Sequence, residues 1–160
     1  MSDQQTFTDF YAANASRVLR AVIATCGSVE AAEDATAEAF QRAWARWKKL
    51  QEHPTPGGWV AVTATNLIRD NWRKEQNGLR LAPRIASPER TLDSAPFDEQ
   101  LRASIARLPI RQREVIALRV LLDLSAEQTA AMLDISTGTV GTHLSRALAT
   151  LRAELAQTLN

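Results

Sequence analysis

The side chains best suited to chemistry lie near the C-terminal end, between Thr137 and Arg146, where hydroxyls gather with one imidazole and one guanidinium. If this segment is helical, one face carries the apolar residues Val140, Leu144, Ala147 and Leu148. The other face then presents Thr137, Thr139, Gly141, Thr142, His143, Ser145 and Arg146. Such polar groups can contact base edges or phosphates in a DNA major groove. The pattern predicts a DNA-reading helix, and a merely solvated helix face is the alternative that this segment leaves open.

The residues just before this segment predict the rest of a helix-turn-helix. Ser125 lies three residues before Gln128, which is the spacing of a capping box at a helix start. Ser136 can cap the next helix, and the turn around Asp134 between the two helices is short. Ala130 is small enough for the helices to approach closely where they cross. These features together favour a helix-turn-helix that places its second helix in the groove.

A second group of polar side chains lies between Trp59 and Lys74. Asn66 precedes Asp70 and Asn71 by one helical turn, and the end of the segment carries the cations Arg69, Arg73 and Lys74. Cations of this kind can hold phosphates, while amides and aromatic rings can bind an unstacked base. The other interpretation is that the cations only stabilise the C-terminal end of a helix by interacting with its dipole, while Trp59 and Trp72 lie in the core. Both interpretations remain open on these residues alone.

Helices are predicted to position both groups. From Phe7 to Trp47 apolar residues recur every three or four positions, and Gly27-Ser28 divides this run into two helices that pack as a hairpin, with Ser28 as the N-cap of the second. Prolines and glycines at 53–58 predict a loop, and a third helix follows over about 59–74. Periodicity is lost over 76–96 and then resumes. We therefore expect an all-α chain of two small helical domains, at 1–76 and 98–160, joined by a flexible linker at 77–97.

The composition excludes several classes of protein. Two distant histidines, His53 and His143, one cysteine and no glycine-rich phosphate loop supply no catalytic constellation, so neither an enzyme, a metal centre nor a cofactor is expected. Cys26 is expected to be a small buried hydrophobe. No apolar run approaches the ~20 residues that a membrane span needs, and the polar, acidic start does not suit a secretory signal. The net charge of +1 gives weak support for nucleic-acid binding. A cytoplasmic protein is expected.

The order of these segments resembles a known family. The run from Ala32 to Trp44 is followed by the loop, the 59–74 helix, the linker, Leu108-Pro109, Arg113-Glu114-Val115 and the helix-turn-helix. This arrangement is similar to the extracytoplasmic-function (ECF) sigma factors, which are promoter-recognition subunits of bacterial RNA polymerase, and it extends over nearly the whole chain. The resemblance implies that the first domain is sigma region 2, a helical bundle, and that the last is sigma region 4.

The resemblance also implies partners and site residues. Core RNA polymerase is expected to bind through the clamp helices of its largest subunit and through its flap, with the clamp helices contacting Asp34, Glu38, Gln41 and Arg42. The 53–58 loop and the third helix are expected to melt the minus-ten element and hold a flipped base, using Thr65, Asn66, Arg69, Arg73 and Lys74. The minus-thirty-five element would be read by Thr139, Thr142, His143, Ser145 and Arg146. An anti-sigma factor is a further partner that the family suggests.

Some positions depart from the family pattern. Ala37 stands where a glutamine is usual in the clamp-binding helix, Thr65 replaces a common arginine, and Gly141 and His143 occupy positions where lysine or arginine usually contacts DNA. We therefore expect weak DNA binding by the isolated chain, with affinity coming mainly from the polymerase. The rival hypotheses are a helix-turn-helix regulator whose first domain senses a signal or dimerises, and a helical adaptor with no DNA role. The sigma-factor interpretation fails if the two halves form a single fused globule with the Thr142–Arg146 face buried.

Overall fold

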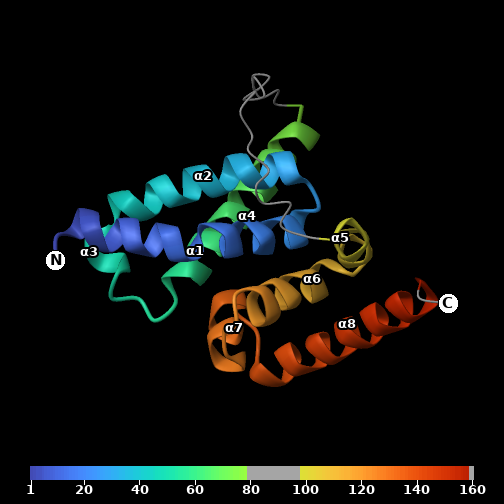
Figure 1. Cartoon of the computed structure of the whole chain (residues 1–160). Coiled ribbons are helices and arrows are strands. Elements are labelled where there is room, and N and C mark those ends of the chain that lie inside the picture. Colours follow the sequence, from blue (N-terminus) through green and yellow to red (C-terminus); the bar gives the residue numbers. More distant parts are fainter. Residues whose placement is uncertain (79–97, 159–160) are drawn as a thin grey trace.

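The computed structural model describes residues 1–78 and 98–158 (Figure 1). Helices α1 (Asp3–Cys26), α2 (Val29–Ala45), α3 (Trp47–Leu50) and α4 (Pro56–Gln76) form a first unit. A second unit contains α5 (Glu99–Ala106), α6 (Ile110–Ile116), the π-helical turn η1 (Ala117–Leu121), α7 (Ala126–Leu133) and α8 (Thr137–Thr158). These described residues contain no strand, so the all-α prediction is confirmed. Most of the predicted linker, residues 79–97, lies outside the described residues.

The α1–α2 hairpin breaks where the sequence predicts. α1 ends at Gly27, whose φ of 80° is readily adopted only without a Cβ and whose N–H donates to the Ile23 carbonyl at 2.8 Å. One residue later, the Ser28 hydroxyl accepts a hydrogen bond from the Ala31 N–H at 3.1 Å and caps α2. α4 packs across both helices of the hairpin. The core between these three helices contains Val18, Val22, Ala39, Phe40, Ala43, Val60 and Ala64.

The prediction of a loop at 53–58 is wrong for residues 56–58, because α4 begins at Pro56. Proline suits the first turn of a helix, since its fixed φ is helical and its missing N–H would have had no partner there. The His53 Nδ1 accepts a hydrogen bond from the Thr55 N–H at 2.9 Å just before this start. Gly58 lies in the first turn of α4, and a Cβ there would meet Leu124 Cδ2 at 3.1 Å. The glycine therefore allows a close approach between α4 and the second unit.

In the second unit, α8 packs along α6 and α7. The buried core of this unit includes Leu108, Val115, Leu133, Val140, Ala147 and Leu151. Between α6 and α7 the chain makes the π-helical turn η1, which the sequence analysis does not predict, and the Leu122 N–H donates to the Ala117 carbonyl at 3.0 Å. The Arg119 guanidinium donates to the Leu124 carbonyl at 2.6 Å and holds the connection to α7.

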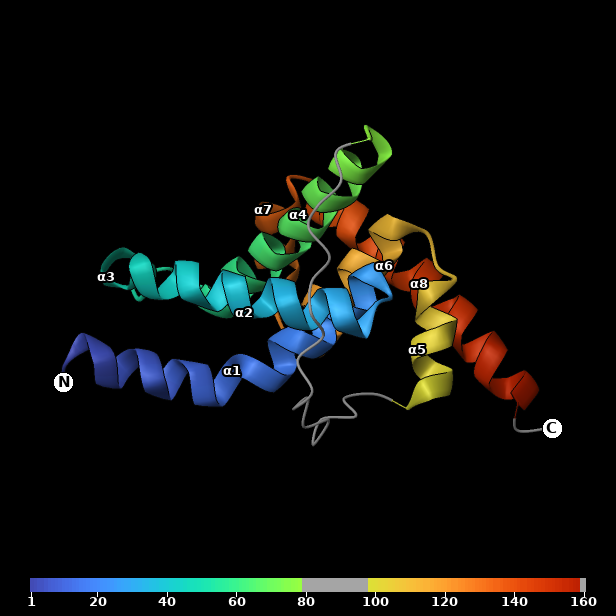
Figure 2. The same ribbon diagram turned by 90° about the horizontal axis from the view of Figure 1, so that it is seen from above.

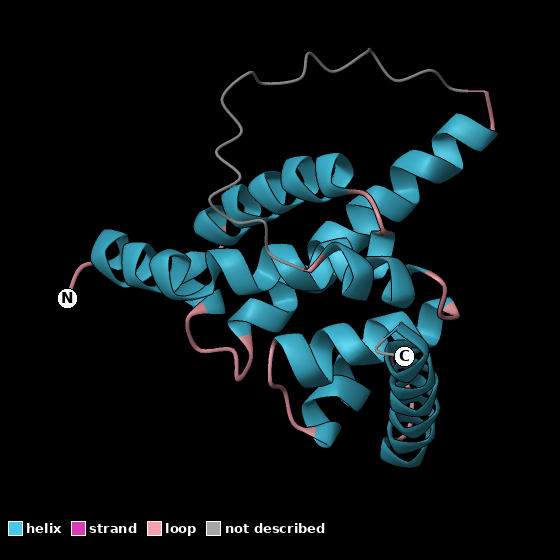
Figure 3. Cartoon of the chain, turned by 45° about the vertical axis from the view of Figure 1, so that its right-hand side comes forward, coloured by secondary structure: helices cyan, strands magenta, loops and turns pink. Residues whose placement is uncertain are grey.

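The two units pack against each other. The second unit lies along one side of α1 in Figures 1 and 3, and Figure 2 places α5 beside the C-terminal end of that helix. Buried residues from both units join one hydrophobic core. The Arg113 guanidinium donates to the Thr25 carbonyl at 2.9 Å, and the Arg102 guanidinium donates to the Gly27 carbonyl at 3.0 Å. The sequence predicts two modules separated along the chain and gives no sign of this packing.

Candidate nucleic-acid interface

The helix-turn-helix is built by the caps that the sequence predicts. The Ser125 hydroxyl accepts from the Gln128 N–H at 3.0 Å, and the Gln128 side-chain oxygen accepts from the Ser125 N–H at 3.0 Å, which completes the capping box of α7. The Ser136 hydroxyl accepts from the Thr139 N–H at 3.0 Å at the start of α8. The turn between the helices passes through Asp134, whose φ is 56°, a left-handed conformation that aspartate tolerates.

The polar face of α8 is largely open to solvent. Thr142, Ser145 and Arg146 are exposed, whereas Thr139 and His143 are half-buried. The opposite face carries Val140 and Ala147, which have no exposed surface. α8 therefore turns an apolar face to α6 and α7 and a polar face outward.

Two of the threonines on this face make hydrogen bonds within the protein. The Thr139 hydroxyl bonds the Ser136 hydroxyl at 2.8 Å, and the Thr142 hydroxyl donates to the Gly138 carbonyl at 3.1 Å. A hydroxyl has two lone pairs beside its proton, so Thr142 retains acceptor capacity toward a ligand. The exposed Arg146 guanidinium is the strongest donor on the face.

The polar residues of α4 divide between open and enclosed positions. Asn66, Arg69, Arg73 and Lys74 are exposed, and Thr65 is half-buried with its hydroxyl donating to the Ala61 carbonyl at 3.0 Å. Arg73 lies 3.8 Å from the carboxylate of Asp70 on its own helix. Arg69 lies 3.6 Å from Glu114 of the second unit.

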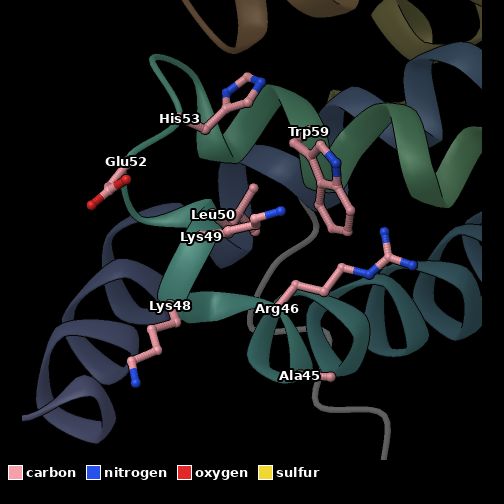
Figure 4. Close-up of a pocket in the computed structure, with 8 residues that line it drawn as sticks. All are labelled: Ala45, Arg46, Lys48, Lys49, Leu50, Glu52, His53 and Trp59. Atoms are coloured by element: carbon pink, nitrogen blue, oxygen red, sulfur yellow. The ribbon is translucent and has the colours of Figure 1, made fainter.

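Trp59 and Arg46 line two hollows in the first unit, and Asn66 borders the smaller one. The larger, of about 710 Å³, is shown in Figure 4 and is lined by Ala45, Arg46, Lys48, Lys49, Leu50, Glu52, His53 and Trp59. Figure 4 also shows the side chains of Arg46 and Lys49 reaching toward the Trp59 ring, with Lys48 pointing away. The smaller, of about 300 Å³, is lined by Arg42, Arg46, Trp59, Thr63, Asn66, Leu67 and Asp70. An aromatic wall with cations around it can hold a flat, negatively charged ligand.

Sequence reasoning missed Arg46, Lys48 and Lys49 as candidate site residues. The signal was a basic run directly after the second predicted helix, at 46–49. The sequence does not show that these cations lie beside Trp59, because their approach to that ring depends on how α3 and α4 pack together.

The residues predicted to bind polymerase share one stripe of α2, because positions 34, 38, 41 and 42 repeat at helical spacing. Gln41 and Arg42 are exposed, and Asp34 and Glu38 are half-buried. Arg42 pairs with Glu38 at 3.1 Å. Arg42 also lines the smaller hollow with Asn66, so the structure brings the α2 and α4 groups together, whereas the α8 group lies in the second unit.

Residues 1–78 and 98–158 hold no group of three or more His, Cys, Asp or Glu side chains that could bind a metal ion. None of the described helices is both long enough and apolar enough to cross a bilayer. Burial raises the pKa of the Cys26 thiol, whose sulfur lies 3.3 Å from the Ser28 carbonyl oxygen.

Comparison with known proteins agrees with this geometry. Residues 10–78 match the family Sigma-70 region 2, and residues 98–151 match Sigma-70, region 4. The RNA polymerase sigma-E factor of Streptomyces coelicolor is 33% identical over 78% of this chain and 71% of its own. The ECF RNA polymerase sigma factor SigW of Bacillus subtilis is 28% identical over 96% of this chain and 90% of its own.

A solved structure shares the fold. The chain resembles one from the co-crystal structure of the sigma factor RpoE in complex with the anti-sigma factor NepR from Bartonella quintana, with a TM-score of 0.73, 21% identity and coverage of 95% of this chain and 98% of that one. These findings define the class as sigma-70-type transcription factors. The chain belongs to the ECF sigma factors of bacterial RNA polymerase. That family consists of transcription initiation factors rather than enzymes.

Proposed function

We propose that this chain binds core RNA polymerase and directs it to promoters, with α8 reading the minus-thirty-five element and the α4 region melting the minus-ten element. The observation that carries the proposal is the pairing of two DNA-type surfaces on one chain. One is the exposed polar face of a capped helix-turn-helix, and the other is the tryptophan-walled, cation-lined hollow in the first unit.

For the minus-ten element, the hollows beside Trp59 suit a single unstacked base. The Trp59 ring offers a stacking surface, and such stacking is worth about 1–3 kcal/mol per base. Arg46 lines both hollows and could hold the adjacent phosphate. The exposed amide of Asn66 borders the smaller hollow, where it could hydrogen-bond a base edge. In this proposal Arg69, Arg73 and Lys74 hold phosphates further along the same helix.

For the minus-thirty-five element, the polar face of α8 would enter the major groove. Thr142 and Arg146 lie one helical turn apart and are exposed together with Ser145, whereas Thr139 and His143 are half-buried nearer the packed side, where the His143 Nδ1 is enclosed. Arginine is the side chain that most often contacts guanine or phosphate in this setting. One arginine and one imidazole provide little charge, so we expect the isolated chain to bind duplex weakly.

The exposed stripe of α2 that contains Gln41 and Arg42 is the proposed contact with the clamp helices of the polymerase largest subunit, and the second unit is the proposed contact with the flap. The chain would then act in the cytoplasm, where the polymerase works. An anti-sigma factor is a further proposed partner, supported by the shared fold with a sigma factor that was crystallised with one.

Paired substitutions in α8 test the division of labour. Thr142→Ala and Arg146→Ala should each weaken transcription from a promoter that depends on its upstream element, by roughly fivefold or more for the arginine. Binding of core polymerase in a pull-down should not change. The matched control is Thr150→Ala, because Thr150 is also exposed on α8 and its hydroxyl donates to the Arg146 carbonyl at 3.1 Å. Equal loss of polymerase binding in the variants would contradict the assignment.

A second experiment tests the α4 surface. Asn66→Ala should slow strand opening more than it weakens duplex binding, and permanganate footprinting of the polymerase complex measures this directly. Unchanged melting would remove Asn66 from the site. The rival hypotheses give different outcomes with the unmodified chain, because a helix-turn-helix regulator binds duplex alone as a dimer, and an adaptor binds neither duplex nor core polymerase.

A further inference from the structure

A buried carboxylate lies where the two units meet. Glu114 of α6 is 8% exposed, and its oxygens lie 3.6 Å from the Arg69 guanidinium of α4 and 3.6 Å from the Arg111 guanidinium of α6. Burying an ionised carboxylate is unfavourable unless it is paired. One of its two cationic partners belongs to the other unit. The pairing of Glu114 with Arg69 therefore exists only while the two units are packed, whereas Arg111 stays beside it on the same helix.

The same contact encloses one side of the proposed minus-ten surface. A gap of about 30 Å³ is lined by Thr65, Asn66 and Arg69 from α4, by Glu114 from α6, and by Ala117 and Leu118 from η1. Ligand pockets have volumes of roughly 300–1,000 Å³, so a gap of this size cannot admit a nucleotide. While the units are packed, nucleic acid cannot enter this gap, although the exposed Asn66 can still be reached from the smaller hollow beside Trp59.

The Glu114 carboxylate pairs with the Arg69 guanidinium in the same way that a DNA phosphate would. A guanidinium pairs with a carboxylate and with a phosphate through the same donors. Arg69 is 47% exposed and thus reachable by solvent, yet its charge is directed toward Glu114. A phosphate that approaches Arg69 must therefore compete with a carboxylate of the same chain.

Further contacts hold the second unit in this place. Arg113, next to Glu114, donates to the Thr25 carbonyl at 2.9 Å, and Arg102 donates to the Gly27 carbonyl at 3.0 Å. These carbonyls lie in the last turn of α1 and just beyond it, where backbone acceptors lack helical partners and cations are favoured. Neither of these two arginines nor Glu114 has a role in the proposed promoter contacts, so the contacts serve the packing of the units.

We infer that Glu114 is the centre of an inhibitory clasp within the chain, in which the second unit covers the Thr65 and Arg69 side of α4 and withholds Arg69 from nucleic acid. The inference rests on the proposed function, because it assumes that α4 binds promoter DNA. Opening of the clasp frees Arg69 and exposes Thr65. The chain by itself therefore binds single-stranded DNA less well than its first unit permits.

The test compares two variants of the full chain that gain the same charge. Glu114→Gln opens the clasp, whereas Glu127→Gln neutralises an exposed carboxylate on α7 that has no place in it. Binding of a dye-labelled, mixed-sequence single-stranded oligonucleotide is followed by fluorescence anisotropy. We expect Glu114→Gln to bind about three- to tenfold more tightly than wild type, and Glu127→Gln to differ from wild type by less than about twofold. Equal affinities of the two variants would overturn the inference.

Hydrogen exchange of the same proteins shows whether the units have separated. Peptides that cover η1 and the end of α1 should exchange faster in Glu114→Gln than in Glu127→Gln. Faster exchange without tighter binding would show that the clasp opens but does not inhibit, which also overturns the inference. If Glu114→Gln loses helical circular dichroism, Arg113→Gln replaces it. That variant lowers the positive charge, so a gain in DNA affinity supports the clasp and no gain refutes it.

The failure of the proposed function gives a different result. A wild-type chain that does not bind core polymerase refutes that function, whatever the two glutamine variants do. Conversely, equal DNA binding by the two variants refutes the clasp even when the wild-type chain supports transcription with core polymerase.

Discussion

Removal of the capping-box hydroxyl by Ser125→Ala should lower the free energy of unfolding by about 1 kcal/mol. The Ser125 hydroxyl is the acceptor for the Gln128 N–H at 3.0 Å, and that N–H belongs to the first turn of α7, where it has no helical partner. Both residues are half-buried, so water can replace only part of the lost bond. The expected loss therefore lies near the middle of the usual 0.5–2 kcal/mol range for such caps, not at its lower end.

The reciprocal bond permits a double-mutant cycle. Gln128→Ala removes the acceptor for the Ser125 N–H, also at 3.0 Å, and should cost about 0.5 kcal/mol because alanine regains some helix propensity. The two bonds hold the same turn, so the double variant should lose less than the sum of the single losses, with a coupling of about 0.5 kcal/mol. Ser145→Ala is the control, because Ser145 is exposed in the interior of α8 and alanine should be neutral or slightly stabilising there.

Urea unfolding followed by far-UV circular dichroism measures these differences in free energy. In a thermal scan, a loss of about 1 kcal/mol should lower the melting temperature by roughly 2–4 °C in a chain of this size. If Ser125→Ala changes stability by no more than Ser145→Ala does, the capping box does not stabilise α7. Strict additivity in the cycle would show that the two bonds act independently.

Three other perturbations follow from contacts in the two units. Trp47→Phe should lower the free energy of unfolding in urea by about 1–2 kcal/mol. The phenylalanine ring can still pack on Phe10, but the 2.8 Å hydrogen bond from the Trp47 Nε1 to the Thr6 hydroxyl is lost. No change in stability would show that this bond is dispensable. Val140→Ala should cost about 2–3 kcal/mol by the same measurement, since Val140 is fully buried, and a cost below about 1 kcal/mol would contradict the packing of α8. Because burial raises the pKa of Cys26, less thiolate is present at pH 8, and iodoacetamide should alkylate the folded chain more slowly than a short cysteine peptide; equal rates would refute this.

Local signals in the sequence predicted most of the helices. Gly27 and Ser28 mark the end of α1 and the start of α2 through backbone conformation and capping, which depend on near neighbours alone. The same holds for Ser125 and Gln128 at the start of α7. The error at 53–58 came from treating Pro56 as a helix breaker, although proline is compatible with the first turn of a helix.

Contacts between distant segments were beyond the reach of sequence patterns. The Arg113–Thr25 hydrogen bond and the Arg69–Glu114 pair join residues far apart in the chain, and no periodicity indicates them. Such contacts depend on how two apolar surfaces meet. For the same reason the α4 and α8 polar groups could be proposed as candidates, but the cations beside Trp59 were found only from the structure.

The proposed role as a promoter-recognition subunit requires that the chain bind bacterial core RNA polymerase. The purified chain is mixed with core enzyme and passed over a size-exclusion column, and the fractions are assayed for transcription from genomic promoter fragments. We expect the chain to elute with the core enzyme and to confer initiation at specific start sites, as a member of this family should. A chain that elutes alone and leaves the core enzyme without specific initiation would contradict the proposed role.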